Sequence, residues 1–181
     1  MKLLCVDVES NGLMGKAFCV GAVLLGDDDV EATWLARTSL VGYPSRWVHE
    51  NVMPAIADVP ITHTNLLGMS RDFVTWTNEQ VHQHHPVVAC YDWGVPVDAG
   101  FVVDAYRDVF TAMSRRGDRI DTPVWHEVAT LLVAAGLDVN ADRWELTGEA
   151  KPPLAKHHPL YDAEGSARAA RWLLRRTGAW R

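Results

Sequence analysis

Three strand-like runs joined by short turn signals occupy the first 35 residues, and they constrain the fold more than any other feature. The runs are Lys2 to Glu9, Phe18 to Leu25 and Val30 to Leu35. Ser10-Asn11-Gly12 opens the first connection, and Gly26-Asp27-Asp28-Asp29 forms the second. Connections this short join neighbouring antiparallel strands. The sequence therefore predicts an antiparallel meander that begins with Lys2 to Glu9.

Two carboxylates, Asp7 and Glu9, stand at the end of the first predicted strand. Side chains alternate between the faces of a strand, so these two acids point the same way. Their negative charges repel unless a positive group lies between them, and Mg²⁺ and Mn²⁺ prefer such oxygen ligands. For an isolated D-x-E pair, the alternative is a strand that simply runs out into a polar loop. The rest of the chain has to decide between the two interpretations.

Runs with helical spacing alternate with short apolar runs in the remainder of the chain. The expected helices are Tyr43 to Ile56, Ser70 to His84, one opened by Pro96 and continued from Phe101 to Val109, Trp125 to Ala135, and Pro159 to Arg176. The expected further strands are Pro86 to Cys90 and Arg119 to Thr122, and a long loop near the site is expected from Asp138 to Leu154. This order predicts one domain over residues 1–181, an α/β fold whose mixed sheet combines the meander with parallel strands between flanking helices.

The composition narrows the class of protein. No apolar run has the length of a membrane span, and no signal peptide is recognisable, so we expect a cytoplasmic protein with no membrane partner. Cys5, Cys19 and Cys90 lie in apolar runs without C-x-x-C spacing, which indicates buried thiols. The net charge of -6 argues against a protein that grips long nucleic acid by charge alone, but it does not exclude action at a strand end. The arginines gather at residues 115–119 and 168–181, as solvated helix faces or as contacts to phosphate or a dimer partner.

A second group of polar residues precedes and opens the last predicted helix. His157 lies in the loop and Asp162 in the first helical turn, so both can face the strand ends. An acid in a first turn also interacts favourably with the helix dipole, which is the structural alternative for Asp162 alone. Asp92, after the strand Pro86 to Cys90, and Asp98, at the start of the next helix, add two more acids. Carboxylates from three distant segments together with a histidine favour a metal site.

These residues, in this order, resemble the DEDDh branch of the 3′–5′ exonucleases, the group with proofreading subunits, RNase T and oligoribonuclease. V-D-V-E-S-N-G-L followed by V-G-A-V-L-L is similar to the first motif of that family, and H-H-P-L-Y-D-A-E is similar to its third. The resemblance spans nearly the whole chain. It implies an RNase H-like fold, two Mg²⁺ or Mn²⁺ ions, and release of nucleoside 5′-monophosphates from the 3′ end of a nucleic acid strand.

The second motif departs from the family pattern, which usually has an Asn at the strand end and the Asp four or five residues later. Here the strand ends in Cys90-Tyr91-Asp92, and Asp98-Ala99-Gly100-Phe101-Val102 resembles the D-x-x-F-L start of the family's helix. Asp92 lies nearer the carboxyl end of the strand, where ligand sites cluster in such sheets. We place Asp98 first and keep Asp92 open as the second-motif ligand.

The resemblance also implies a role for each residue. Asp7 would bridge both ions, Glu9 and Asp162 would complete the first, and the mid-chain Asp would hold the second. His157 would accept the proton of the attacking water, with His158 as the alternative if the third motif is displaced by one residue.

Several aromatic and apolar residues are candidates for contacts to the terminal base. Trp93 follows the inner strand, and Leu13 and Met14 follow the first two acids, so these three are predicted to bind substrate. Trp47 and Trp172 fall at helical core spacing and are interpreted as core residues. The histidines at positions 82, 84 and 85 lack carboxylate or cysteine partners and are interpreted as a surface junction.

We therefore expect a metal-dependent 3′–5′ exonuclease acting on single-stranded RNA or DNA, with a possible homodimer by family analogy. Two alternatives stay open. One is an RNase H-like endonuclease, which would need the acids but not His157. The other is a non-catalytic module that keeps the fold and binds nucleic acid or a partner protein. Sequence does not decide between RNA and DNA, because that choice depends on contacts to the 2′-hydroxyl.

Overall fold

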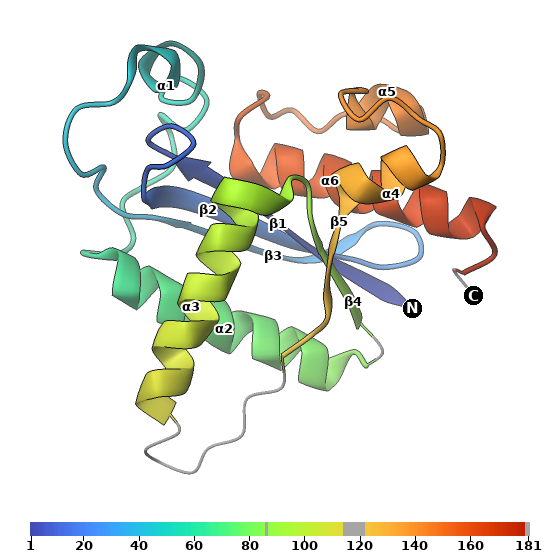
Figure 1. The fold of residues 1–181 in the computed structure, drawn as a ribbon, viewed down its shortest axis with the longest axis horizontal. Coiled ribbons are helices and arrows are strands. Elements are labelled where there is room, and N and C mark those ends of the chain that lie inside the picture. The colour runs from blue at the N-terminus through green and yellow to red at the C-terminus, as the bar shows by residue number, and fades with distance from the viewer. Residues whose placement is uncertain (86, 114–121, 180–181) are drawn as a thin grey trace.

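A mixed five-stranded sheet is the centre of the molecule in the computed structural model, which describes residues 1–85, 87–113 and 122–179 (Figure 1). The strands within these residues are β1 (Lys2–Ser10), β2 (Ala17–Leu25), β3 (Val30–Arg37), β4 (Val87–Tyr91) and β5 (Trp125–Glu127). Their order is β3-β2-β1-β4-β5, with β1, β2 and β3 antiparallel and β1, β4 and β5 parallel. The predicted combination of a meander with parallel strands is confirmed.

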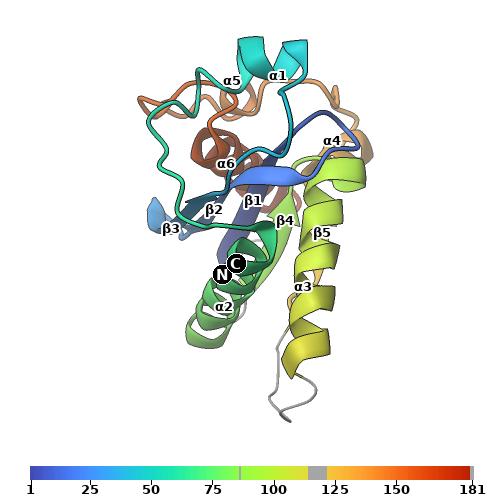
Figure 2. The same cartoon turned by 90° about the vertical axis from the view of Figure 1, so that its left-hand side faces the viewer.

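Helices cover both faces of the sheet. They are α1 (Arg46–Asn51), α2 (Leu66–Gln83), the short π-helix η1 (Gly94–Asp98), α3 (Ala99–Met113), α4 (Val128–Ala134), α5 (Arg143–Thr147) and α6 (Pro159–Arg176). Seen from the side, α2 and α3 lie on one face of the sheet and α6 lies on the other (Figure 2). Both views place α1 and α5 at the same end of the molecule.

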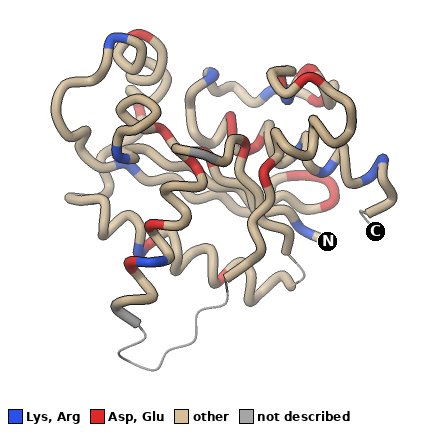
Figure 3. The backbone as a smooth tube through the Cα atoms, in the orientation of Figure 1, with Lys and Arg blue, Asp and Glu red and all other residues tan. Residues whose placement is uncertain are grey.

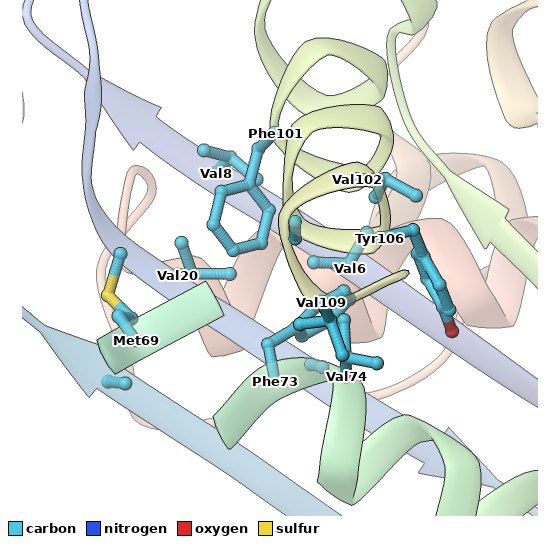
Figure 4. Close-up of a cluster of buried hydrophobic side chains, with 13 residues drawn as sticks. Val6, Val8, Val20, Met69, Phe73, Val74, Phe101, Val102, Tyr106 and Val109 are labelled. Carbon is cyan, nitrogen blue, oxygen red and sulfur yellow. The ribbon is translucent and has the colours of Figure 1, made fainter. Parts of the chain in front are cut away.

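The alternation of side chains along β1 assigns its residues to the two faces. Val6 and Val8 pack with Phe73 of α2 and Phe101 of α3, in the cluster of buried side chains shown in Figure 4. Leu3 and Cys5 belong to the opposite cluster, which includes buried alanines of α6. Because period-2 alternation continues to the end of the strand, Asp7 and Glu9 lie on the α6 face.

The first predicted helix, Tyr43 to Ile56, is shorter than expected. α1 begins after the N-cap Ser45, whose hydroxyl accepts a hydrogen bond from the Val48 amide, and it ends at Asn51. Pro54 has no N–H to donate to the preceding turn, so only irregular turns follow. Val48 is nevertheless fully buried, as its helical spacing predicts.

The expected helix Trp125 to Ala135 is wrong at its beginning, because Trp125–Glu127 forms the edge strand β5 instead. Pairing with β4 gives these residues backbone hydrogen bonds on one side, and the Trp125 ring stacks against Tyr91 at 6.2 Å between centroids. The predicted loop from Asp138 to Leu154 contains the helix α5, which Asp142 caps. α2 begins at Leu66 rather than Ser70, because Asn65 caps it. The bounds predicted for α6 are confirmed.

The predicted arginine cluster at positions 115–119 lies outside the described residues. So do most of the brief strand predicted from Arg119 to Thr122, the first residue of the strand predicted from Pro86 to Cys90, and the last arginine of the group at 168–181.

Candidate active site

A cavity of about 850 Å³ opens where β1 and β4 end and α6 begins. Its lining includes residues from β1, α1, η1, α5 and α6 and from the loops beside them. Acids predominate among its charged side chains: Asp7, Glu9, Asp92, Asp98, Asp142 and Asp162, against the basic residues Arg143 and Lys156. Figure 3 shows acidic positions, in red, on several separate segments near the middle of the molecule. Every acid predicted for the site therefore lies in one cavity.

One carboxylate oxygen of Asp7 is left without a partner from the part of the protein that the structure describes. Its Oδ2 atom is buried and has no hydrogen-bond partner among the described residues. Burial raises the pKa of the Asp7 carboxyl well above its usual range, and the nearby charges of Asp98 and Asp162 raise it further. An unpartnered buried carboxylate among other acids fits a divalent cation, which would offset the repulsion.

Glu9, His157 and Asp162 form the closest group of potential ligands. Their side-chain ligand atoms all lie within 4.8 Å of one another, and His157 Nδ1 is 3.8 Å from Glu9 Oε1. Burial, and then the charge of Asp162, raises the pKa of Glu9 to about 8. The pKa of Asp162 rises to about 6, mainly because of burial and despite a hydrogen bond from the backbone of His157. The predicted first and third motifs therefore meet in space.

The beginning of α6 lies unusually close to the sheet. Gly21 of β2 is the register partner of Asp7, and a Cβ atom at this glycine would lie 2.6 Å from the carbonyl carbon of Pro159. Only glycine leaves room for this backbone approach. The side chain of His158 caps the helix by accepting a hydrogen bond from the Leu160 amide at 3.3 Å. The first turn of α6 thereby brings Asp162 to Asp7 and Glu9.

His157 and His158 have different surroundings. His158 is the buried N-cap of α6 and does not line the cavity, whereas His157 does. The backbone of His157 has a φ of 68°, in the left-handed region, and its N–H donates to Asp162 Oδ2 at 2.8 Å. Burial, assisted by the charge of Lys156, lowers the pKa of the His157 ring. The ring is therefore neutral at neutral pH and able to accept a proton.

The two candidates for the second motif differ in their partners. Asp92 Oδ1 accepts hydrogen bonds from Arg143 Nε at 2.9 Å and from its terminal nitrogen at 2.8 Å. Asp98 is 5% exposed, and its recorded hydrogen-bond partners among the described residues are backbone N–H groups, those of Trp93 at 3.3 Å and of Val8. Burial is the main cause that raises the pKa of Asp98 to about 8. Asp92 is already paired with a cation, and Asp98 is not.

A π-helical turn places Asp98 in the cavity. η1 runs from Gly94 to Asp98, and the Gly94 amide donates to Glu127 Oε1 at the end of β5 at 2.5 Å. π-helical turns occur often at functional sites, but the sequence between Trp93 and Asp98 gave no sign of one. The turn occupies most of the interval between the end of β4 and Asp98.

The residues predicted to contact a base are only partly gathered at the cavity. Leu13 and Trp93 line it and are 72% and 48% exposed, whereas Met14 is 90% exposed and does not line it. The interpretation of Trp47 as a core residue is wrong: this side chain is 54% exposed, lines the cavity and contacts the His157 ring. Helical spacing finds the apolar face of α1 but cannot show that a neighbouring tryptophan faces a site.

Two of the C-terminal arginines, Arg168 and Arg171, have structural partners. Arg168 contacts Asp29, Glu149 and Glu164, and Arg171 donates to Glu149 at 3.0 Å and to backbone carbonyls of the β2–β3 turn. These two side chains, 9% and 3% exposed, tie α6 to the loop before it and are not available to phosphate.

No helix within the described part of the chain is long and apolar enough to cross a membrane.

Comparison with known proteins gives a clear result for the fold alone. No model of a protein family and no curated protein matches the chain by sequence. Among solved structures, exonuclease X in complex with 5′ overhanging duplex DNA is similar with a TM-score of 0.57 and 17% identity, over 97% of this chain and 93% of that one. The nuclease domain of 3′hExo, a DEDDh family member bound to rAMP, has a TM-score of 0.52 and 12% identity, over 99% and 94%.

A longer nuclease is also similar. The zinc-bound complex of E. coli exonuclease I with single-stranded DNA has a TM-score of 0.63 and 11% identity, and it covers 99% of this chain. The match spans 41% of the exonuclease I chain. Taken with the sheet order and the meander, these likenesses show that the chain has the RNase H-like fold of the DEDDh exonucleases over nearly its full length.

Proposed function

We propose that this protein is a metal-dependent 3′–5′ exonuclease and that residues 1–181 act as one exonuclease domain. It would hydrolyse phosphodiester bonds at the 3′ end of single-stranded RNA or DNA and release nucleoside 5′-monophosphates. The observation that supports this best is the convergence of Asp7, Glu9, Asp98 and Asp162 on one cavity beside His157, with Asp7 Oδ2 buried and unpartnered.

The chain's own carboxylates would hold two divalent ions, Mg²⁺ or Mn²⁺. We assign Asp7 to both ions, Glu9 and Asp162 to the first, and Asp98 to the second. We assign no ion to Asp92, because Arg143 already neutralises it. Bound in this way, the ions would supply a water of lowered pKa and stabilise the charge on the leaving oxygen.

His157 would act as the general base. Its ring is kept neutral by burial, and a ring nitrogen would take the proton of the attacking water. Its position beside Glu9, with Nδ1 at 3.8 Å from Oε1, lets the carboxylate stabilise the imidazolium that forms. The hydrogen bond from the His157 amide to Asp162 ties the base to a proposed metal ligand.

Two alternatives are weaker on physical grounds. A module that only binds nucleic acid or a partner protein gains nothing from several mutually repelling, buried carboxylates. An RNase H-like endonuclease would need these acids but not His157. Binding of rAMP by 3′hExo agrees with a nucleoside monophosphate product, which we carry over as part of the proposal.

A time course on matched 5′-labelled RNA and DNA oligonucleotides, with Mg²⁺, Mn²⁺ or EDTA, tests the proposal. We expect a ladder that shortens from the 3′ end, needs the metal and disappears in Asp7→Asn. Internal cuts would support the endonuclease, and intact oligonucleotides in every lane would support the binding module. Sedimentation of the same preparation would test the homodimer that the family resemblance implies.

A further inference from the structure

The ring of His157 lacks a hydrogen bond that would fix its orientation. Among the bonds recorded for the described residues, His157 uses only its backbone N–H, which donates to Asp162. The distance of 3.8 Å from Nδ1 to Glu9 Oε1 exceeds that of a hydrogen bond. A general base works only within a narrow range of positions, so another contact has to hold this ring.

Trp47 supplies such a contact. Its ring meets the His157 ring edge-on, with 5.1 Å between centroids and 79° between planes. This T-shaped arrangement is a preferred geometry for aromatic pairs. The side chain of His157 keeps 26% exposure, so the indole covers the ring without closing it off from the cavity.

The segment that carries Trp47 is anchored at two points. Val48 of α1 and Val52, which caps its C-terminal end, pack with Phe18 in a small separate core. Asn11, two residues after Glu9, donates from Nδ2 to the Tyr43 carbonyl at 2.9 Å and accepts from the Ser45 amide at 2.8 Å. Asn11 thus links the end of β1, which carries two proposed metal ligands, to the segment that carries Trp47.

We propose that Trp47 is a positioning residue for His157. The two hydrogen bonds of Asn11 hold it in place relative to the acids of β1. This inference rests on the proposed function, in which His157 is the base. The indole limits the rotation of the imidazole, so its loss should slow the chemical step more than it weakens substrate binding.

The test compares Trp47→Ala and Trp47→Phe with Tyr43→Ala, a control four residues away on the same segment. This substitution removes only a side chain that is 96% exposed and does not line the cavity, and it keeps the backbone carbonyl that accepts from Asn11. We expect Trp47→Ala to lower kcat by about tenfold or more while KM changes by less than about threefold. Trp47→Phe, which keeps an aromatic edge, should recover most of the rate, and Tyr43→Ala should match the wild type. Asn11→Ala should lower kcat in the same direction.

A second measurement needs no turnover. In the metal-free protein, the NMR resonances of the His157 ring, assigned with His157→Gln, should shift in Trp47→Ala because the ring current of the indole is lost, and Tyr43→Ala should leave them in place. An inactive wild type with this shift present would refute the proposed function but not the contact. An active wild type whose kcat is insensitive to Trp47→Ala, or whose KM alone rises, would overturn the inference.

Discussion

Asp92 and Asp98 lie in the same cavity, yet among the described residues Asp92 has a cationic partner and Asp98 has none. Asp92 is paired with Arg143, a side chain that is 10% exposed. Asp98 is buried and keeps its carboxylate free of any described basic group. We therefore expect removal of the charge at Asp98 to impair activity but not stability, and removal of the charge at Asp92 to impair stability.

We predict that Asp98→Asn abolishes activity, with a rate loss of about 100-fold or more, and leaves the melting temperature unchanged or higher. Asp92→Asn should lower the free energy of unfolding by about 1–3 kcal/mol, because it leaves the Arg143 guanidinium with a neutral partner. Thermal melting and the oligonucleotide assay on both variants check this. An active Asp98→Asn beside an inactive, well-folded Asp92→Asn would reverse the assignment.

Asp7 is the residue whose substitution should affect stability and metal binding in the most clearly different ways. Its Oδ2 is buried and unpartnered, and its pKa is raised first by burial and then by Asp98. In the absence of metal, Asp7→Asn should raise the free energy of unfolding at pH 8 by about 1–2 kcal/mol, because the folded variant no longer has to bury a charge among like charges or take up a proton to avoid it.

The same variant should lose the rise in melting temperature that Mn²⁺ gives the wild type, since a ligand that binds only the native state stabilises it. Calorimetry of both proteins in EDTA and in Mn²⁺ measures the two effects together. A variant that keeps the full Mn²⁺ response would exclude Asp7 from the metal site.

At the scale of elements, the site depends on how closely α6 approaches β2. A Cβ at Gly21 would lie 2.6 Å from the Pro159 carbonyl carbon and 2.7 Å from the Leu160 nitrogen. These are backbone atoms, so no side-chain rotation can relieve the contact. The first turn of α6, with Asp162 on it, would have to move away from β1.

We therefore predict that Gly21→Ala lowers both the free energy of unfolding, by about 1–3 kcal/mol, and the activity. Gly100→Ala in α3 is the matched control, because nothing lies within 4 Å of the added Cβ. Alanine is the better helix former by up to about 1 kcal/mol, so the control should be as stable as the wild type or more so. If the two variants had the same melting temperature and activity, α6 could accommodate a Cβ atom at position 21, and the prediction would be wrong.

At the scale of the whole molecule, sequence patterns predicted what depends on local alternation and missed what depends on distant partners. Asp7 and Glu9 share a face because the period of a strand is 2, and Pro159–Arg176 is helical as its spacing indicates. The partner that decides the state of Asp92 is 51 residues away in sequence, inside a segment expected to be a loop. Helical spacing predicts a core position for Trp47, because spacing alone does not distinguish a side chain in the core from one that lines a cavity.

The pH dependence of stability follows from the acids as a group. In the folded protein, burial and mutual repulsion raise the pKa of Glu9 and of Asp98 to about 8 and that of Asp162 to about 6. In the unfolded chain these groups titrate near 4. The folded state thus binds more protons between these limits, so its stability is greatest below about pH 4 as far as these groups contribute, and it declines as the pH rises through 8.

We predict that the melting temperature of the metal-free protein falls from pH 5 to pH 8.5, and that saturating Mn²⁺ raises it most at the alkaline end. Metal binding requires deprotonated carboxylates, so the ion replaces protons that the folded state would otherwise hold. Melting curves across this range in EDTA and in Mn²⁺, with Asp7→Asn as the control, measure the effect. A melting temperature in EDTA that rose steadily with pH would mean that partners within the chain stabilise the ionised forms of Asp7, Glu9, Asp98 and Asp162. The electrostatic argument for a cation among these acids would then fail.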